Sequence, residues 1–96
     1  MTLHELQSTK REQLLQLAAR HGASNVRIFG SVARGDNTSE SDVDVLVDIE
    51  PRRSLLDQVA LKLDFEELLG CPVDVVEARA LHPYLVERVL QEAVPL

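Results

Sequence analysis

The segment Ser41–Ile49, which reads SDVDVLVDI, decides the fold of this 96-residue chain. Valine occupies every second position from Val43 to Val47, and alternating β-branched residues predict a strand with one apolar face. Asp42 and Asp44 lie two residues apart, so their carboxylates point together to the opposite face. The segment therefore predicts a strand that helices cover on one side and that carries a pair of acids on the other.

Turn and capping signals on both sides of this strand predict the remaining elements. Thr2 followed three residues later by Glu5 is a capping box, and Pro83 is typical of the first turn of a helix. The predicted elements are helices over Thr2–Gly22, Ser54–Leu69 and Pro83–Glu92, a short helical segment over Val32–Arg34, and strands over Val26–Phe29, Val43–Ile49 and Val73–Val76. This order predicts one α/β (α+β) domain over residues 1–96, a small three-stranded mixed sheet flanked by about four helices.

Two predicted helices carry apolar stripes at helical spacing. In the Ser54–Leu69 helix the stripe supports the helical assignment, and it comprises Leu55, Leu56, Val59, Leu63, Leu68 and Leu69. In the last helix the stripe comprises Leu81, Leu85, Val86, Val89 and Leu90. This second stripe fits two interpretations, simple core packing or part of a surface for a partner protein.

Composition and charge exclude several classes of protein. Hydrophobic residues make up 45% and charged residues 27% of the chain, as in soluble globular proteins, and no run of about eighteen apolar residues suggests a membrane span. The formal net charge is −6, and Arg52-Arg53 is a local basic pair without interleaved aromatic residues, so independent binding to nucleic acid is not expected. Cys71 is the single cysteine and cannot form an internal disulfide, which fits a reducing cytoplasm.

Three aspartates lie within apolar strands and not on an evident solvent face. Besides Asp42 and Asp44, Asp74 is embedded in the predicted strand VDVV. Carboxylates that converge on one sheet face repel one another and resist ionisation unless a cation lies between them. Mg²⁺ is a hard cation that proteins bind through a few carboxylates together with substrate phosphates. The three aspartates therefore predict a magnesium site.

The dipeptide Gly30-Ser31 follows the first predicted strand and predicts a phosphate contact. A glycine lets a phosphate approach the backbone closely, and the serine hydroxyl and nearby amides can donate hydrogen bonds to it. Ser31 at a strand end can meet Asp42 at a strand start only if the first two strands run antiparallel. Asp42 and Asp74 both lie near strand starts, so the second and third strands are expected to be parallel. This topology is inferred from the supposed site and not from periodicity.

The spacing of these residues forms a known pattern. Gly30-Ser31, ten further residues and Asp42-Val43-Asp44 read G-S-x10-D-x-D, which resembles the signature of the polymerase-β-type nucleotidyltransferase superfamily. The longer strings FGSVARG at 29–35 and SDVDVLV at 41–47 resemble the stand-alone minimal nucleotidyltransferases (MNT) of prokaryotes. The resemblance implies the nucleotidyltransferase fold and transfer of a nucleoside monophosphate from a triphosphate to an acceptor hydroxyl.

The resemblance implies a role for each of the three carboxylates. Asp42 and Asp44 would be ligands to both of two Mg²⁺ ions. Asp74 would complete the site of the ion that activates the acceptor hydroxyl, and could help to remove its proton. All three would thus be catalytic as well as metal-binding.

Nucleotide binding would fall to the loop that follows the first strand. Gly30 and Ser31 would hold the β- and γ-phosphates of ATP. Arg34 could contact phosphate, or it could pair with a carboxylate and orient the loop, and both interpretations stay open. Lys62 is long enough to reach a triphosphate, but nothing in the sequence places it there. Glu77 follows the third strand, and both a supporting position beside the site and a place on the surface stay open.

The acceptor is expected on a partner protein or on a second copy of this chain, since only about twenty residues follow Asp74. The resemblance extends to the antitoxins of toxin–antitoxin pairs, whose partners are HEPN-domain ribonucleases. It thus implies transfer of AMP from ATP to a tyrosine of a HEPN toxin. An alternative is a non-catalytic binding module that neutralises its partner by steric cover. Transfer to a small molecule or a nucleic-acid end is disfavoured, because an acceptor domain and a basic surface are missing.

Overall fold

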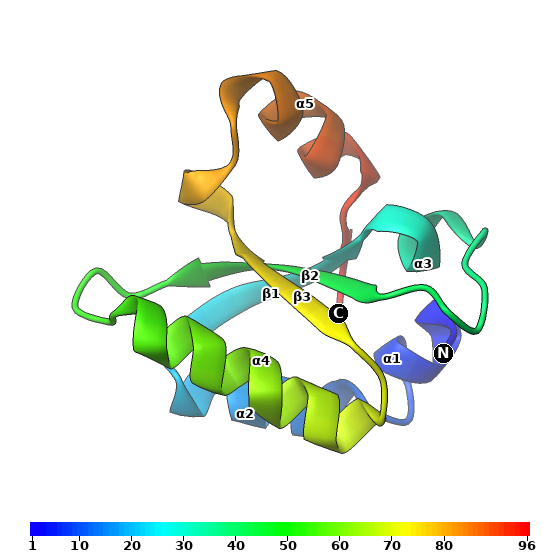
Figure 1. Cartoon of the computed structure of the whole chain (residues 1–96), viewed down its shortest axis with the longest axis horizontal. Coiled ribbons are helices and arrows are strands. Elements are labelled where there is room, and N and C mark those ends of the chain that lie inside the picture. Colours follow the sequence, from blue (N-terminus) through cyan, green and yellow to red (C-terminus); the bar gives the residue numbers. More distant parts are fainter.

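The computed structural model describes residues 1–96 and shows a mixed sheet between layers of helices (Figure 1). The sheet has the order β3-β2-β1-β4, with strands β1 (Ala23–Phe29), β2 (Val43–Ile49), β3 (Val73–Glu77) and β4 (Val94–Pro95). β1 is antiparallel to β2, and β2 is parallel to β3, which confirms the topology inferred from the supposed site.

The prediction of three strands was wrong, because β4 adds a fourth at the edge of the sheet. β4 pairs antiparallel with β1, and the amide of Leu96 donates a hydrogen bond to the carbonyl of Val26 over 3.1 Å. A strand of two residues has no periodicity in the sequence, so only its pairing with β1 defines it. The consequence is that the end of the chain is fixed beside β1.

The helices are α1 (Leu3–Gln7), α2 (Arg11–Arg20), α3 (Gly30–Arg34), α4 (Leu55–Leu69) and α5 (Pro83–Glu92), with a 3₁₀ turn η1 (Ala78–Ala80) before α5. The single helix predicted over Thr2–Gly22 is therefore two helices. The Thr2 side chain caps α1 by accepting a hydrogen bond from the Glu5 amide, but the Glu5 carboxylate accepts from the Thr2 hydroxyl and not from the Thr2 amide, so the predicted capping box is only half formed. The Ser8 hydroxyl donates to the carbonyl of His4, and the chain turns there. None of these helices has the length and apolar character needed to cross a membrane.

The hydrophobic core lies between the sheet and the layer of α2 and α4, while α5 and η1 lie on the other side (Figure 1). Val43, Val45 and Val47 point into this core, as the alternation predicted. Leu46 points to the opposite face and is also fully buried. No residue of α5 is fully buried, so the interpretation of its apolar stripe as core is at most partly right.

The apolar stripe of α4 is only partly the buried face of this helix, since Leu68 and Leu69 pack against the core. Leu61 and Phe65 are the fully buried residues of this helix, whereas Leu56, Val59 and Leu63 are exposed. α4 is apolar on both sides, and helical spacing alone cannot select between two apolar faces. The predicted ends are correct, since Ser54 and Asp57 form a capping box and Gly70 ends the helix in the left-handed conformation.

Because Leu61 lies in the core and Leu90 does not, a leucine-to-alanine substitution should lower the free energy of unfolding by different amounts in α4 and α5. Leu61→Ala leaves a cavity beneath α4 and should lower the free energy of unfolding by about 2–5 kcal/mol. Leu90→Ala on α5 removes a side chain that is 48% exposed and should cost less than about 1 kcal/mol. Urea denaturation followed by circular dichroism measures both values, and equal costs would contradict this assignment.

Candidate active site

The three predicted carboxylates lie at one end of two neighbouring strands. Asp44 in β2 and Asp74 in β3 are register partners in the parallel ladder, so their backbones are about 4.8 Å apart. Asp42 directly precedes β2 and lies two residues from Asp44, on the same face. Asp44 is half-buried, whereas Asp42 and Asp74 are exposed. The parallel pairing thus brings together acids that are 30 residues apart in the chain, from Asp44 to Asp74.

The electrostatics of Asp44 reflect this crowding. Burial raises the pKa of Asp44 above its ordinary value, and the charges of Asp74 and Asp42 raise it further. Arg34 acts in the opposite direction, while Glu92 adds to the repulsion. Asp44 is therefore a carboxylate whose ionised form lacks sufficient compensation from the protein alone.

The donor set at this place fits a magnesium ion. Asp42, Asp44 and Asp74 offer only carboxylate oxygens, which Mg²⁺ prefers, and a cation would relieve the repulsion that raises the pKa of Asp44. No three acidic, histidine or cysteine side chains of this structure already converge on one point that could hold an ion. Asp42 and Asp74 are exposed side chains on fixed strands, so a change of rotamer at each can direct them toward a common ion.

The Gly30-Ser31 loop lies directly against this acidic cluster. Phe29, the last residue of β1, is the register partner of Asp44, and Gly30 then begins α3 with a φ of 72°. A Cβ atom at Gly30 would collide with the carboxylate of Asp44, and a positive φ disfavours any other residue. The antiparallel pairing of β1 with β2 therefore places the predicted phosphate loop beside the predicted metal ligands.

Glu92 is a residue of this site that the sequence analysis missed. Its carboxylate accepts a hydrogen bond from the backbone N–H of Gly30 and pairs with Arg34, whose Nη1 lies 3.1 Å from each of its two oxygens. The contact from Glu92 to Gly30 spans 62 positions of the chain, so no local pattern could indicate it. Glu92 thus occupies hydrogen-bond donors that were predicted to receive phosphate.

In this structure Arg34 pairs with carboxylates, which is the second of the two roles that the sequence left open. It pairs with Glu92 and also, through Nε, with Asp36 at 3.2 Å. The side chain is nearly half exposed, so both ion pairs are open to exchange with another anion. Arg34 therefore lies at the rim of the loop. Its charge is directed toward Glu92, the same residue that accepts a hydrogen bond from the Gly30 amide.

Other charged residues that the sequence left open lie in structural pairs outside the site. Lys62 pairs with Glu66 at 3.0 Å, and Glu66 also accepts a hydrogen bond from the N–H of Val73. Glu77 pairs with Arg79 at 2.7 Å. Two further pairs are His21 with Asp64 at 2.6 Å, and Asp48 with Arg27 at 3.1 Å.

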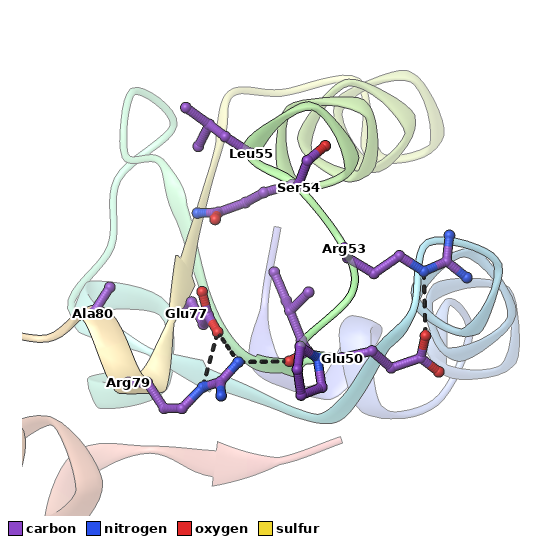
Figure 2. A pocket seen from close by; sticks show the side chains of 10 residues that line it. Glu50, Arg53, Ser54, Leu55, Glu77, Arg79 and Ala80 are labelled. Atoms are coloured by element: carbon purple, nitrogen blue, oxygen red, sulfur yellow. Dashed lines mark hydrogen bonds and ion pairs between the residues drawn. The ribbon is translucent and has the colours of Figure 1, made fainter.

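A pocket of about 420 Å³ lies at the opposite end of the sheet (Figure 2). Ile49 at the end of β2 lines it, roughly 20 Å along the strand from Val43 at about 3.3 Å per residue. Figure 2 shows that Arg53 is paired with Glu50, and that Arg79 is paired with Glu77 and donates to the carbonyl of Ile49. Both guanidinium groups are thus engaged within the chain, and this pocket is separate from the aspartate cluster.

The fold and this arrangement of acids define a class of enzyme, and comparison with known families agrees. Residues 10–96 match the nucleotidyltransferase domain family, so the chain belongs to that family and is a nucleotidyltransferase. Two relatives indicate which kind of nucleotidyltransferase the chain is similar to. The chain is 38% identical over 94 residues to the protein adenylyltransferase MntA of Thermococcus cleftensis, covering 98% of this chain and 95% of that protein. It is 42% identical over 84 residues to MJ0435 of Methanocaldococcus jannaschii, provisionally named a protein adenylyltransferase, covering 88% and 90%.

Solved structures confirm the fold. One provisionally described as a minimal nucleotidyltransferase is 54% identical, with a TM-score of 0.88, and the match covers all of this chain and 97% of that one. A toxin–antitoxin structure with AMP-PNP matches with a TM-score of 0.76 at 20% identity, over 88% of this chain and 69% of that chain. The second match shows a shared fold.

Removal of the Asp44 charge should stabilise the metal-free protein. Because the folded-state pKa of Asp44 is raised, the protonated form favours folding, and this contribution is lost as the pH rises through the folded pKa. Asp44→Asn should therefore raise Tm at neutral pH in EDTA by roughly 2–5 °C, and the gain should disappear as the pH falls below the ordinary value of 3.8.

Asp48→Asn is the matched control for this thermal-denaturation experiment. Asp48 lies on the same strand and face, but its carboxylate is paired with Arg27. Asp48→Asn removes this ion pair and should leave Tm unchanged or lower it. A fall in Tm for Asp44→Asn would show that the cluster is not under repulsion.

Proposed function

We propose that this chain transfers AMP from ATP to an acceptor hydroxyl with the help of two Mg²⁺ ions. The observation that carries this proposal is the junction of three segments, where Asp44 lies beside Asp74 across the β2–β3 ladder and against Gly30 after β1. The acidic cluster, which needs a cation, is thus in contact with the Gly30-Ser31 loop that is proposed to bind phosphate. The names of the relatives at 38% and 42% identity support adenylyl transfer.

Each residue has a defined task in this reaction. The acceptor oxygen forms a bond to the α-phosphorus of ATP, the bond to the β-phosphate breaks, and pyrophosphate leaves. Asp42, Asp44 and Asp74 would hold the ions, which when bound supply positive charge to the attacking oxygen and the departing pyrophosphate. Asp74, which is exposed, can accept the hydroxyl proton.

The phosphate-binding loop would hold the rest of ATP. The Gly30 amide and the Ser31 hydroxyl would donate to the β- and γ-phosphates, and Arg34 would contribute a cation once it leaves Glu92. Glu92 now holds the Gly30 amide and Arg34, so ATP must displace its carboxylate. The contact therefore acts as a competitor for the triphosphate.

The acceptor proposed here is a tyrosine hydroxyl of a HEPN-domain toxin, with this chain as its antitoxin in the cytoplasm. Structures of the same fold include a complex of a tri-AMPylated Shewanella oneidensis HEPN toxin with an MNT antitoxin, matched at 18% identity with a TM-score of 0.71. The relative from Thermococcus cleftensis shares the name MntA with one component of a toxin–antitoxin structure of the same fold, MntA-HepT, which supports the same class of partner.

One observation favours a second candidate, a binding module that neutralises its partner without catalysis. Glu92 occupies the Gly30 amide and Arg34 in this structure, and a site closed in this way would not admit ATP. The two candidates differ in whether the aspartates are needed for neutralisation or only the protein surface.

The direct test is intact-mass spectrometry of the HEPN protein after incubation with this chain, ATP and Mg²⁺. Mass increments of one AMP are expected with the wild type, and Asp42→Asn/Asp44→Asn should lower their rate at least about 100-fold, since charge at the reacting groups is lost. Asp48→Asn is the control and should retain the activity. A stable complex with no mass change for any variant would support the binding module.

The competition by Glu92 gives a further prediction for the affinity of ATP. Glu92→Gln should tighten ATP binding by about 3- to 10-fold, because a neutral amide releases Arg34 and the Gly30 amide more readily. Asp36→Asn is the matched control, since Asp36 pairs with Arg34 but does not contact Gly30, and its effect should be smaller. Calorimetric titration with ATP and Mg²⁺ measures both, and weaker binding by Glu92→Gln would instead make Glu92 a part of the binding site.

A further inference from the structure

The solvent-facing side of α4 is apolar over most of its length. Leu55 and Leu56 are 72% and 79% exposed, Leu63 is 57% exposed and Val59 is 43% exposed. The one other exposed position of the helix is Glu67. Steps of three and four residues place Leu56, Val59, Leu63 and Glu67 in a single stripe along the helix. A helix that is apolar on both sides is typical of one that is covered on both sides.

The two ends of this stripe carry opposite charges without partners in the chain. Arg52 precedes α4, Glu67 lies in its last turn, and neither forms an ion pair. Their neighbours Arg53 and Glu66 are both paired. Each of the two also has the sign that the dipole of α4 disfavours, a cation at the N-terminus and an anion at the C-terminus. An antiparallel neighbour with the same charges would compensate both.

We propose that a second copy of this chain packs on α4, antiparallel, to form a symmetric dimer. A two-fold axis between Val59 and Ala60 places Leu56 against Leu63 of the partner subunit. The same axis brings Arg52, which precedes α4, toward Glu67 of the partner subunit, because the N-terminal end of each helix then lies beside the C-terminal end of the other. In such an isologous contact each pair occurs twice, so the complementarity of the two ends is satisfied on both copies. Ala60, a small residue at the axis, allows close approach of the two helices.

This dimer leaves both candidate active sites open. α4 lies on the side of the sheet that is opposite to α5, whose residue Glu92 contacts the Gly30 loop (Figure 1). The aspartate face of each copy is therefore directed away from the dimer contact. The two copies would act as independent active sites that are presented on opposite sides of one assembly.

Sedimentation velocity over a range of concentrations tests the dimer. The wild type should reach twice the 10.7 kDa of one chain. Leu56→Arg/Leu63→Arg should remain at the mass of one chain, because like charges would meet across the axis. The mutated side chains are exposed, so circular dichroism and Tm should show that the variant still folds. Leu90→Arg on α5 is the control and should form the dimer as the wild type does.

A charge exchange distinguishes this geometry from other modes of assembly. Arg52→Glu alone should weaken the dimer, since it places two acids together at each end, and Arg52→Glu/Glu67→Arg should restore it. A wild type that stays at the mass of one chain at every concentration would overturn the proposal. So would a dimer that persists in Leu56→Arg/Leu63→Arg, or a double exchange that fails to restore association.

Discussion

The parallel pairing of β2 with β3 is the constraint on which the rest of this structure depends. It places Asp44 beside Asp74, on the side of the sheet that faces away from the hydrophobic core. The long helix α4 makes the crossover that parallel strands require, and packs Leu61 and Phe65 beneath them. Burial and mutual repulsion raise the pKa of Asp44 as a consequence. The fold thus creates a local need for a cation that a nucleotide–metal complex can meet.

Much of this arrangement could be predicted from the sequence because it is encoded locally. The alternation through Val43–Ile49 fixes which face carries the acids, and the capping box at Ser54 with Gly70 fixes the ends of α4. The strand directions followed from the requirement that Ser31 meet Asp42, and the structure confirms both pairings. The directions of the strands were therefore predicted from the chemistry of the site, whereas hydrophobic periodicity predicted only the elements.

The features that escaped prediction depend on contacts between distant parts of the chain. The contact of Glu92 with Gly30 exists because α5 and β4 return the chain to the edge of the sheet beside β1. A two-residue strand and a single glutamate give no signal of their own. The buried face of α4 could not be predicted for a different reason, since Leu61 and Leu63 are equally apolar and only packing decides which is covered.

The central claim is that the aspartates bind ATP only through divalent metal, and equilibrium binding of ATP by calorimetry tests it most directly. The account predicts binding of one ATP per chain with Mg²⁺, and loss of binding in EDTA, because the acidic cluster repels the triphosphate when no cation is present. Asp42→Asn/Asp44→Asn should lower the affinity for ATP, and it should also reduce the difference between ATP binding with Mg²⁺ and in EDTA. ATP binding of equal strength in EDTA, undiminished in this variant, would contradict the account.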